Sequence, residues 1–224
     1  MQDENNQRQP DWRDVNLAAY TNTWWEPGRS KWWIYLWRLT GFWIIKVIPC
    51  EVMFDGYLNR FKCWLLRRFG AKLGKNIVLR ACEIYYPWNL EIGDNCWIGY
   101  ESNFYSLVPI KIGANATVSQ RAFLCVGGHD TTEVGFGLIV GPITVKDGAW
   151  VGAGTFVGPG VTLHEGAVAA AGSVVVKDIP SMEIWGGNPC KKIKDRQINL
   201  DGVPPRAPSL SKFSPEVLAR GESQ

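Results

Sequence analysis

A repeat of six residues constrains the fold of this chain more than any other feature of its sequence. Aliphatic residues recur at that interval, and the residue four positions after each of them is mostly small. The later run comprises Val145, Val151, Val157, Leu163, Ala169 and Val175. The earlier run, which contains one phenylalanine and a slip of two residues, comprises Ile92, Ile98, Phe104, Ile112, Val118 and Leu124.

A period of six fits neither an α-helix nor a half-buried strand. It fits a chain wound as a triangular prism, with three short strands per coil and the coils stacked at strand spacing. The aliphatic residue then points inward from each face, and the small residue fits the tight corner. Glycine follows the aliphatic residue at positions such as Gly93, Gly113 and Gly152, where we expect it to permit the backbone geometry of the turn. The sequence therefore predicts an all-β fold, a parallel β-helix.

The period fails between Leu124 and Val145, which leaves a loop around VGGHDTTEVGFGLIVGP. A long excursion from a regular coil is typical of a functional segment. This loop carries His129, and the only other histidine, His164, lies at a predicted corner and is expected to be a surface residue. Imidazole is suited to general-base chemistry near neutral pH, so His129 is the candidate base.

The chain before the repeats is basic and rich in tryptophan. Residues 31–69 have a helical pattern, with a break expected near Ile48 because Pro49 disfavours helical dihedral angles in the preceding residue. From Arg29 to Lys75 there are ten bases and two acids. This composition favours contact with anionic lipid headgroups. Packing of the aromatic side chains against the rest of the protein or a neighbouring subunit explains it equally well.

Charge within the first helical piece argues for an interfacial helix rather than a membrane span, because Lys31 and Arg38 lie on one helical face. The polar N-terminus lacks the apolar core of a signal peptide, and the six cysteines show no close pair. We therefore expect a cytoplasmic protein, or one held peripherally on the inner face of the cytoplasmic membrane. A net charge of +3 argues against nucleic-acid binding.

Composition divides the chain into four expected parts. They are a polar arm over 1–30, a basic Trp-rich helical segment over 31–70, the β-helix over 71–196 and a Pro- and Ser-bearing tail over 197–224.

Residues 71–196 resemble the hexapeptide-repeat acyltransferases through GPITVKDGAWVGAGTFVGPGVTLHEGAVAAAGSVVVKDIP and the ending GGNPCKKIKDR. FGAKLG, YPWNLEIGDNCWIG and SQRAFLCVGGHD are similar to the colanic acid biosynthesis acetyltransferases of exopolysaccharide pathways. The resemblance implies a left-handed β-helix and a homotrimer with active sites between subunits. It also implies direct transfer of acetyl from acetyl-CoA, as co-substrate and without a metal, to a hydroxyl of a saccharide or lipid-linked saccharide, with His129 as the base.

Similarity to the galactoside and maltose acetyltransferases, through WVGAG and AAGSVVVKDIP, implies where coenzyme A binds. Trp150 would line the pantetheine channel, and the backbone N–H near Ala153 would stabilise the oxyanion. The other matched positions are Ala171, Val176, Lys177, Lys191 and Lys194. For the two last lysines, a solvated basic end of the coil is the alternative interpretation.

The acceptor site departs from those enzymes. Gly99 and Leu107 stand where the galactoside enzymes carry an Asn and an Asp that hold the sugar, so the acceptor should differ. Asn103 and Tyr105 are nearby polar residues that are candidates for binding the acceptor sugar. The alternative interpretation is that they are corner or surface residues without a role in binding. Asp130 would orient the imidazole or bind acceptor hydroxyls, or it would cap a turn.

Other interpretations stay open. Cys125 lies four residues before His129, but a packed cysteine fits its strand better than an acyl-enzyme nucleophile does. A zinc enzyme on the same coil needs three histidines per metal, which two per chain do not supply. N-acylation of an amino sugar and a non-catalytic trimeric scaffold remain alternatives.

Overall fold

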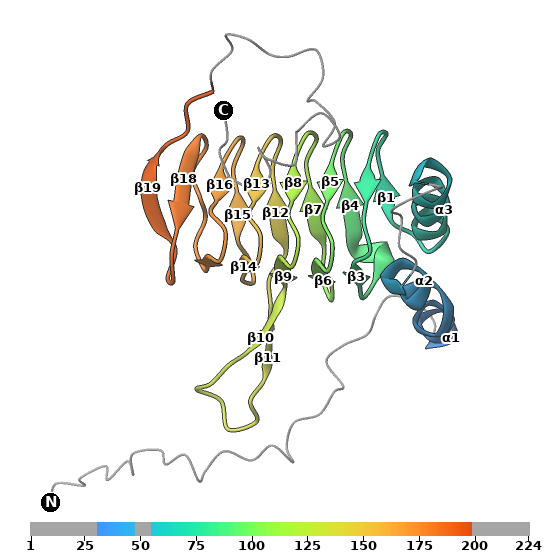
Figure 1. The fold of residues 1–224 in the computed structure, drawn as a ribbon. Helices are drawn as coiled ribbons and strands as arrows, with labels where there is room; N and C mark the ends of the chain where they lie inside the picture. The colour runs from blue at the N-terminus through green and yellow to red at the C-terminus, as the bar shows by residue number, and fades with distance from the viewer. Residues whose placement is uncertain (1–30, 48–54, 199–224) are drawn as a thin grey trace, which may run out of the picture.

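The computed structural model describes residues 31–47 and 55–198, which form a prism of short strands with helices at one end (Figure 1). The expected polar arm over 1–30, the expected break near Ile48 and the tail from residue 199 onward lie outside the described residues.

Two helical stretches precede the strands. In the first, α1 (Lys31–Leu36), the wide π-helical turn η4 (Trp37–Gly41) and α2 (Phe42–Val47) follow one another without a gap. The second is α3 (Asp55–Arg68), and a short turn of 3-10 helix, η5 (Pro87–Asn89), lies within the coils. Within the described residues, no helix combines the length and apolar character needed to cross a membrane.

Three sheets form the faces of the prism, here called sheets A, B and C. Sheet A contains β1 (Lys72–Leu73), β4 (Leu90–Ile92), β7 (Ile110–Ile112), β12 (Ile143–Val145) and β15 (Thr162–Leu163). Sheet B contains β2 (Val78–Leu79), β5 (Trp97–Ile98), β8 (Thr117–Val118), β13 (Trp150–Val151), β16 (Val168–Ala169), β18 (Glu183–Gly186) and β19 (Lys191–Asp195). Sheet C contains β3 (Glu83–Ile84), β6 (Asn103–Tyr105), β9 (Phe123–Cys125), β14 (Phe156–Val157) and β17 (Val174–Val175).

All pairings within these sheets are parallel except that of β18 with β19, which is antiparallel. Val145 of β12 pairs with Leu163 of β15, so one coil advances the chain by three repeats of six. The aliphatic residues of both runs point inward, and each is at most 2% exposed. The predicted parallel β-helix with an N-terminal helical segment is confirmed.

The role assigned to glycine needs a correction. Gly93, which follows an inward aliphatic residue, does not have a positive φ; a Cβ there would lie 2.7 Å from the backbone N of Ala114 in the next coil. The left-handed residue comes two positions later, at Asn95 (φ 57°) in an early coil and at Gly154 (φ 65°) in a late one. The glycine after the aliphatic residue therefore lets successive coils approach closely. The residue two positions after that glycine adopts the left-handed conformation of the turn.

The first helical stretch packs on the prism through Trp37, which is fully buried and donates its indole N–H to the carbonyl of Ile84 at 3.1 Å. Phe69 lies against both Trp33 and Trp37, with ring centroids 4.9 Å apart in each pair. The opposite side of the same stretch stays exposed at Trp32 and at three further residues. These are Tyr35, Leu39 and Trp43. The tryptophans of this segment thus divide into a packing set and an exposed set.

Candidate functional site

The interruption of the repeat is a β-hairpin rather than an irregular loop. Strands β10 (Gly127–His129) and β11 (Leu138–Val140) pair in antiparallel register, and the hairpin projects from the corner where the chain passes from sheet C to sheet A (Figure 1). Its base packs closely on the next coil, since a Cβ on Gly141 would lie 2.5 Å from the backbone N of Gly160. The hairpin is therefore packed against the prism at its base, while its tip extends away from the coils (Figure 1).

His129 ends the outgoing strand of this hairpin, opposite Leu138, and its side chain is exposed. Its Nδ1 lies 2.9 Å from the carbonyl oxygen of Phe136, and the imidazole stacks on the Phe136 ring at 4.8 Å between centroids. A carbonyl oxygen only accepts hydrogen bonds, so Nδ1 carries the proton of the neutral ring. The lone pair is then on Nε2, which is the nitrogen able to accept a proton.

Phe136 holds this position through an uncommon backbone conformation. Its φ is +51°, which is left-handed and rare for a bulky residue. Its N–H donates to the carbonyl of Glu133 at 3.0 Å, which closes the tip of the hairpin. The tip thus turns the Phe136 carbonyl toward the imidazole.

Asp130 caps the same tip. Its Oδ1 accepts hydrogen bonds from the backbone N–H of Thr132 at 2.8 Å and from the Thr132 hydroxyl at 2.6 Å. The hydroxyl, followed by the backbone N–H, lowers the pKa of Asp130 below its ordinary value. The carboxylate therefore stabilises the turn here, and the contact that orients His129 is made by Phe136.

Cys125 has the surroundings of a structural cysteine. Burial raises the pKa of its thiol, although its hydrogen bond to the carbonyl of Gly127 at 3.2 Å acts weakly in the opposite direction. A nucleophilic cysteine needs a lowered pKa. The five described cysteines, Cys63, Cys82, Cys96, Cys125 and Cys190, are free thiols.

Asn103 and Tyr105, the two residues expected to bind the acceptor sugar, lie together on the outer face of sheet C, in β6. Asn103 donates from Nδ2 to Glu83 at 2.8 Å, while its buried Oδ1 has no hydrogen-bond partner within residues 31–47 and 55–198. The Tyr105 ring meets that of Tyr85 edge-on at 5.1 Å. Tyr105 also lies against the base of the hairpin, since a Cβ on Gly127 would lie 3.2 Å from its ring.

The residues matched to coenzyme A lie partly on sheet B. Trp150 is 47% exposed, and its indole N–H donates to the Ser119 hydroxyl at 2.8 Å. Cross-strand pairing continues from Trp150 through Val168 and Ile184 to Lys194, three strand spacings or about 14 Å away. A single row of sheet B thus joins an exposed indole to an exposed ammonium group.

The ammonium groups at this end differ in their partners. Lys192 forms ion pairs with Glu183 and Asp195, each at 2.7 Å. Lys191 and Lys194 are exposed and have no ion pair with any residue that the structure describes. These two positive charges, rather than that of Lys192, are available to an anion.

Ala153 and Ala171 occupy the corner between sheets B and C in successive coils. Gly172 donates to the carbonyl of Ala153 at 2.8 Å, whereas the N–H of Ala153 has no acceptor within the described part of the chain. Ala153 is a partly exposed residue, so an N–H without an acceptor at this corner is able to donate to a ligand.

The structure does not bring all the predicted site residues together in one chain. Trp150, Ala153, Ala171, Lys191 and Lys194 lie on sheet B or at its corner with sheet C. His129, Asp130, Val176 and Lys177 lie at the corner between sheets C and A, with Asn103 and Tyr105 beside them on sheet C. The two sets face different sides of the prism.

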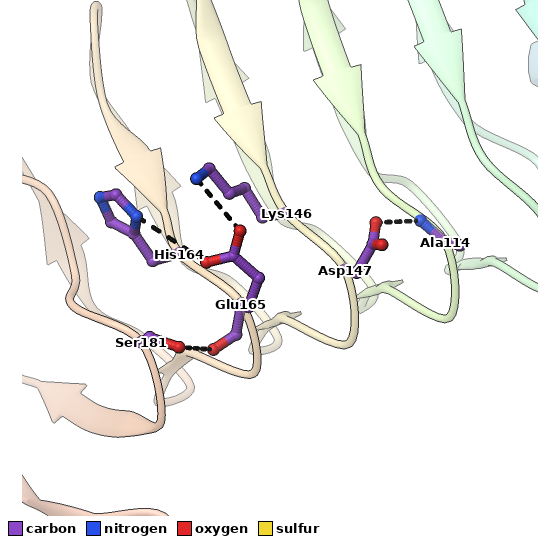
Figure 2. Close-up of polar contacts among 6 residues, drawn as sticks. All are labelled: Ala114, Lys146, Asp147, His164, Glu165 and Ser181. Atoms are coloured by element: carbon purple, nitrogen blue, oxygen red, sulfur yellow. Dashed lines mark hydrogen bonds and ion pairs between the residues drawn. The ribbon is translucent and has the colours of Figure 1, made fainter.

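His164 lies at the third corner, between sheets A and B, in a network of corner contacts (Figure 2). Its Nδ1 is 4.0 Å from Glu165, which also pairs with Lys146 at 3.1 Å. In the neighbouring coil, Asp147 accepts the backbone N–H of Ala114 at 2.8 Å. The Lys146–Glu165 and Asp147–Ala114 contacts join one coil to the next. The side chain of His164, beside its sequence neighbour Glu165, is partly exposed, which agrees with the surface position expected for it. No three His, Cys, Asp or Glu side chains of the described ranges are grouped so as to hold a metal ion.

Comparison with known proteins relates this geometry to a family. The sequence profile described as "Hexapeptide repeat of succinyl-transferase" matches residues 90–119. A protein of Escherichia coli (strain K12) named as the colanic acid biosynthesis acetyltransferase WcaF is 42% identical over 140 residues, which are 62% of this chain and 77% of that protein. The chain belongs to the hexapeptide-repeat acetyltransferases.

Two solved structures agree with this assignment. A galactoside acetyltransferase in complex with coenzyme A superposes with a TM-score of 0.62 at 25% identity, covering 73% of this chain and 82% of that one. A maltose O-acetyltransferase from Clostridium difficile 630 gives a TM-score of 0.58 at 26% identity, covering 74% of this chain and 89% of that one.

In this member of the hexapeptide-repeat acetyltransferases, sequence reasoning missed Phe136. Its contact with His129 depends on the hairpin register and on a left-handed backbone, and only the flanking glycines of GFG hint at either. It also missed that Lys194 shares a row with Trp150, because β19 joins sheet B antiparallel and outside the six-residue repeat.

The tautomer of His129 tests this geometry. Because the Phe136 carbonyl accepts the Nδ1 proton, we expect neutral His129 to be protonated at Nδ1. Long-range nitrogen–proton NMR correlation of the two imidazoles at alkaline pH measures this, with assignment by His164→Gln. A proton on Nε2 of neutral His129 would show that the contact is not made in solution.

Proposed function

We propose that this chain is an acetyl-CoA-dependent O-acetyltransferase that acts on a saccharide hydroxyl, with His129 as general base. The observation that carries the proposal is the contact between Nδ1 of His129 and the Phe136 carbonyl, at the end of the hairpin that leaves the coil. It sets the tautomer whose Nε2 takes up a proton. Two similar solved structures, named as a maltose O-acetyltransferase and as a galactoside acetyltransferase in complex with coenzyme A, support acetyl transfer to a sugar as the reaction class.

The residues fit a direct transfer. Nε2 of His129 removes the proton as the sugar oxygen attacks the thioester carbonyl, and a backbone N–H at Ala153 donates to the oxyanion that forms. Collapse breaks the C–S bond, and the imidazolium returns its proton to the departing thiolate. The products are an O-acetyl sugar and coenzyme A thiol, and His129 is regenerated.

The separation of the two residue sets favours a homotrimer. His129 and Ala153 stand at different corners of one prism, so a base and an oxyanion donor meet only when a second chain is placed against the first. In a threefold ring each chain presents one corner to each neighbour, which forms three identical sites. The active site thus combines the hairpin of one subunit with the corner between sheets B and C of the next.

The row along sheet B suits coenzyme A. The exposed Trp150 ring offers an apolar wall for the pantetheine, and Lys194 offers positive charge to the phosphates about 14 Å away along the row. Lys191 adds a second positive charge on the same strand, β19. Ala171 lies beside Ala153 along the same edge, and Val176 and Lys177 of the neighbouring chain would complete the channel. The similarity to WcaF supports an acceptor from exopolysaccharide biosynthesis, with Asn103, Tyr105 and Asp130 near its hydroxyls.

Replacing His129 tests the chemistry. His129→Ala should lower the rate of coenzyme A release by about a hundredfold or more, since a general base contributes at least that much. His164→Ala is the matched control and should retain the wild-type rate. The assay uses acetyl-CoA with nucleotide sugars and lipid-linked saccharides, and hydroxylamine distinguishes an ester product from an amide. Near-wild-type activity of His129→Ala would remove this residue from the mechanism.

We infer in addition that the helical end of the prism docks on an anionic membrane surface. Trp32, Tyr35 and Leu39 are each more than 60% exposed on one helical stretch. Near α3, Arg60 and Lys75 line a groove of about 570 Å³ beside Trp64. Figure 1 places α1, α2 and α3 at the same end. Exposed aromatic rings together with positive charge favour the interface of an anionic bilayer.

Flotation with vesicles containing phosphatidylglycerol tests this docking. The triple variant Trp32→Ser, Tyr35→Ser, Leu39→Ser should bind at least about tenfold more weakly, because three exposed apolar groups no longer enter the bilayer. Ile193→Ser with Ile198→Ser removes exposed apolar groups at the far end and should change nothing. Absence of wild-type binding, or equal binding of the triple variant, would refute the docking and favour a subunit contact for this face.

A further inference from the structure

A cavity of about 280 Å³ lies between the first helical stretch and the start of sheet C. Among the residues that the structure describes, Arg38, Phe42, Trp43 and Tyr85 line it. Its volume is just below the range of about 300–1,000 Å³ that is common for small-molecule sites. It is large enough for one sugar ring.

The walls of the cavity are aromatic rings held at large angles to one another. Phe42 meets Trp43 edge-on at 5.9 Å between ring centroids, and it meets Tyr85 edge-on at 5.8 Å. Trp43 remains 54% exposed, so one wall is open to an entering molecule. Rings at right angles present both faces and edges to that molecule. The C–H face of a sugar ring packs on the electron-rich face of an aromatic ring.

Arg38 supplies the positive charge of this cavity. Its guanidinium makes one long hydrogen bond, 3.4 Å to the Tyr86 hydroxyl, and no ion pair with any residue in the described ranges. Lys46, which lies near the same rings, is already paired with Glu83. The guanidinium of Arg38 is thus the cation available to a ligand, and its fork matches carboxylate or phosphate oxygens.

The cavity connects with the proposed catalytic hairpin through aromatic contacts. Tyr85 is part of the cavity lining and meets Tyr105 at 5.1 Å, and Tyr105 lies against Gly127, two residues before His129. Strands β3, β6 and β9 are consecutive neighbours in sheet C, so the cavity and the hairpin base are separated by two strand spacings, about 10 Å. A saccharide longer than one ring spans that distance.

We propose that this cavity is a subsite for a negatively charged sugar unit of the acceptor, whose oxygens bind Arg38 and whose ring packs on Trp43 and Tyr85. The proposal rests on the proposed transfer to a saccharide and extends it, because it assigns the acceptor a charge. A uronic acid carboxylate and a sugar phosphate share the chemistry that Arg38 recognises. Residues 31–47 thereby contribute to acceptor specificity as well as to packing.

Binding of three matched sugars tests the subsite. Glucose, glucuronic acid and glucose 1-phosphate are titrated into the full-length protein, with dissociation constants from ligand-observed NMR. Arg38→Gln should weaken binding of the anionic sugars by about tenfold to a hundredfold, as expected for a hydrogen bond to a charged group, and should leave glucose within about twofold. A larger loss of affinity for glucuronic acid would identify a carboxylate as the group that Arg38 binds, and a larger loss for glucose 1-phosphate would identify a phosphate.

Three variants complete the experiment. Arg38→Lys should recover part of the affinity because it keeps the charge, and Tyr85→Leu should weaken all three sugars alike because it removes a ring. Lys111→Gln removes an exposed cation on sheet A and should bind like wild type. Equal binding of wild type and Arg38→Gln, or displacement of the sugars by a neutral alkyl glycol, would overturn the subsite.

The same experiment separates this proposal from the proposed function. His129→Ala should lose coenzyme A release while retaining Arg38-dependent binding of the anionic sugar. If no saccharide supports coenzyme A release but Arg38-dependent binding persists, the transfer reaction fails and the subsite stands. If release proceeds with neutral acceptors and is unaffected by Arg38→Gln, the subsite fails and the transfer reaction stands.

Discussion

The stacking of inward apolar residues at a recurring interval of six is the constraint on which the rest of this structure depends. Each coil buries residues such as Val151 and Leu163 completely, and glycines such as Gly93 allow the next coil to approach at strand spacing. Outward residues then fall into fixed rows, since a slip of one residue would exchange core and surface. The separation of His129 from Ala153 is a direct consequence, and so is the start of the row from Trp150 to Val168, which β18 and the antiparallel β19 then extend to Lys194.

The hairpin differs from the coils in that its geometry does not depend on the six-residue repeat. Its geometry depends on antiparallel pairing, on the left-handed Phe136 and on the cap provided by Asp130, none of which belongs to the coil. A carbonyl fixed in this way orients an imidazole without adding a charge beside it. The proposed base, His129, is therefore oriented by the backbone carbonyl of Phe136, and the neighbouring carboxylate of Asp130 stabilises the turn.

The sequence predicted what depends on periodicity and left open what depends on contacts between distant segments. The inward positions and the interruption around His129 followed from spacing alone. Spacing could not separate a glycine needed for close approach from a residue needed for a left-handed turn, so Gly93 was misassigned and Asn95 overlooked. It could not separate buried Trp37 from exposed Trp32 either, because that division depends on how the helix docks on β3. The cavity at Arg38 joins segments about fifty residues apart and leaves no local pattern.

Assembly of the proposed site from two chains is the central claim, and subunit mixing tests it most directly. His129→Ala removes the base, and Ala153→Trp fills the corner where the thioester would lie; trimers of either variant alone should be inactive. Random mixing should restore activity at roughly a quarter of the sites, because an intact His129 then meets an intact Ala153 across a subunit boundary. Mixed trimers that form but show no activity above either parent would contradict the account.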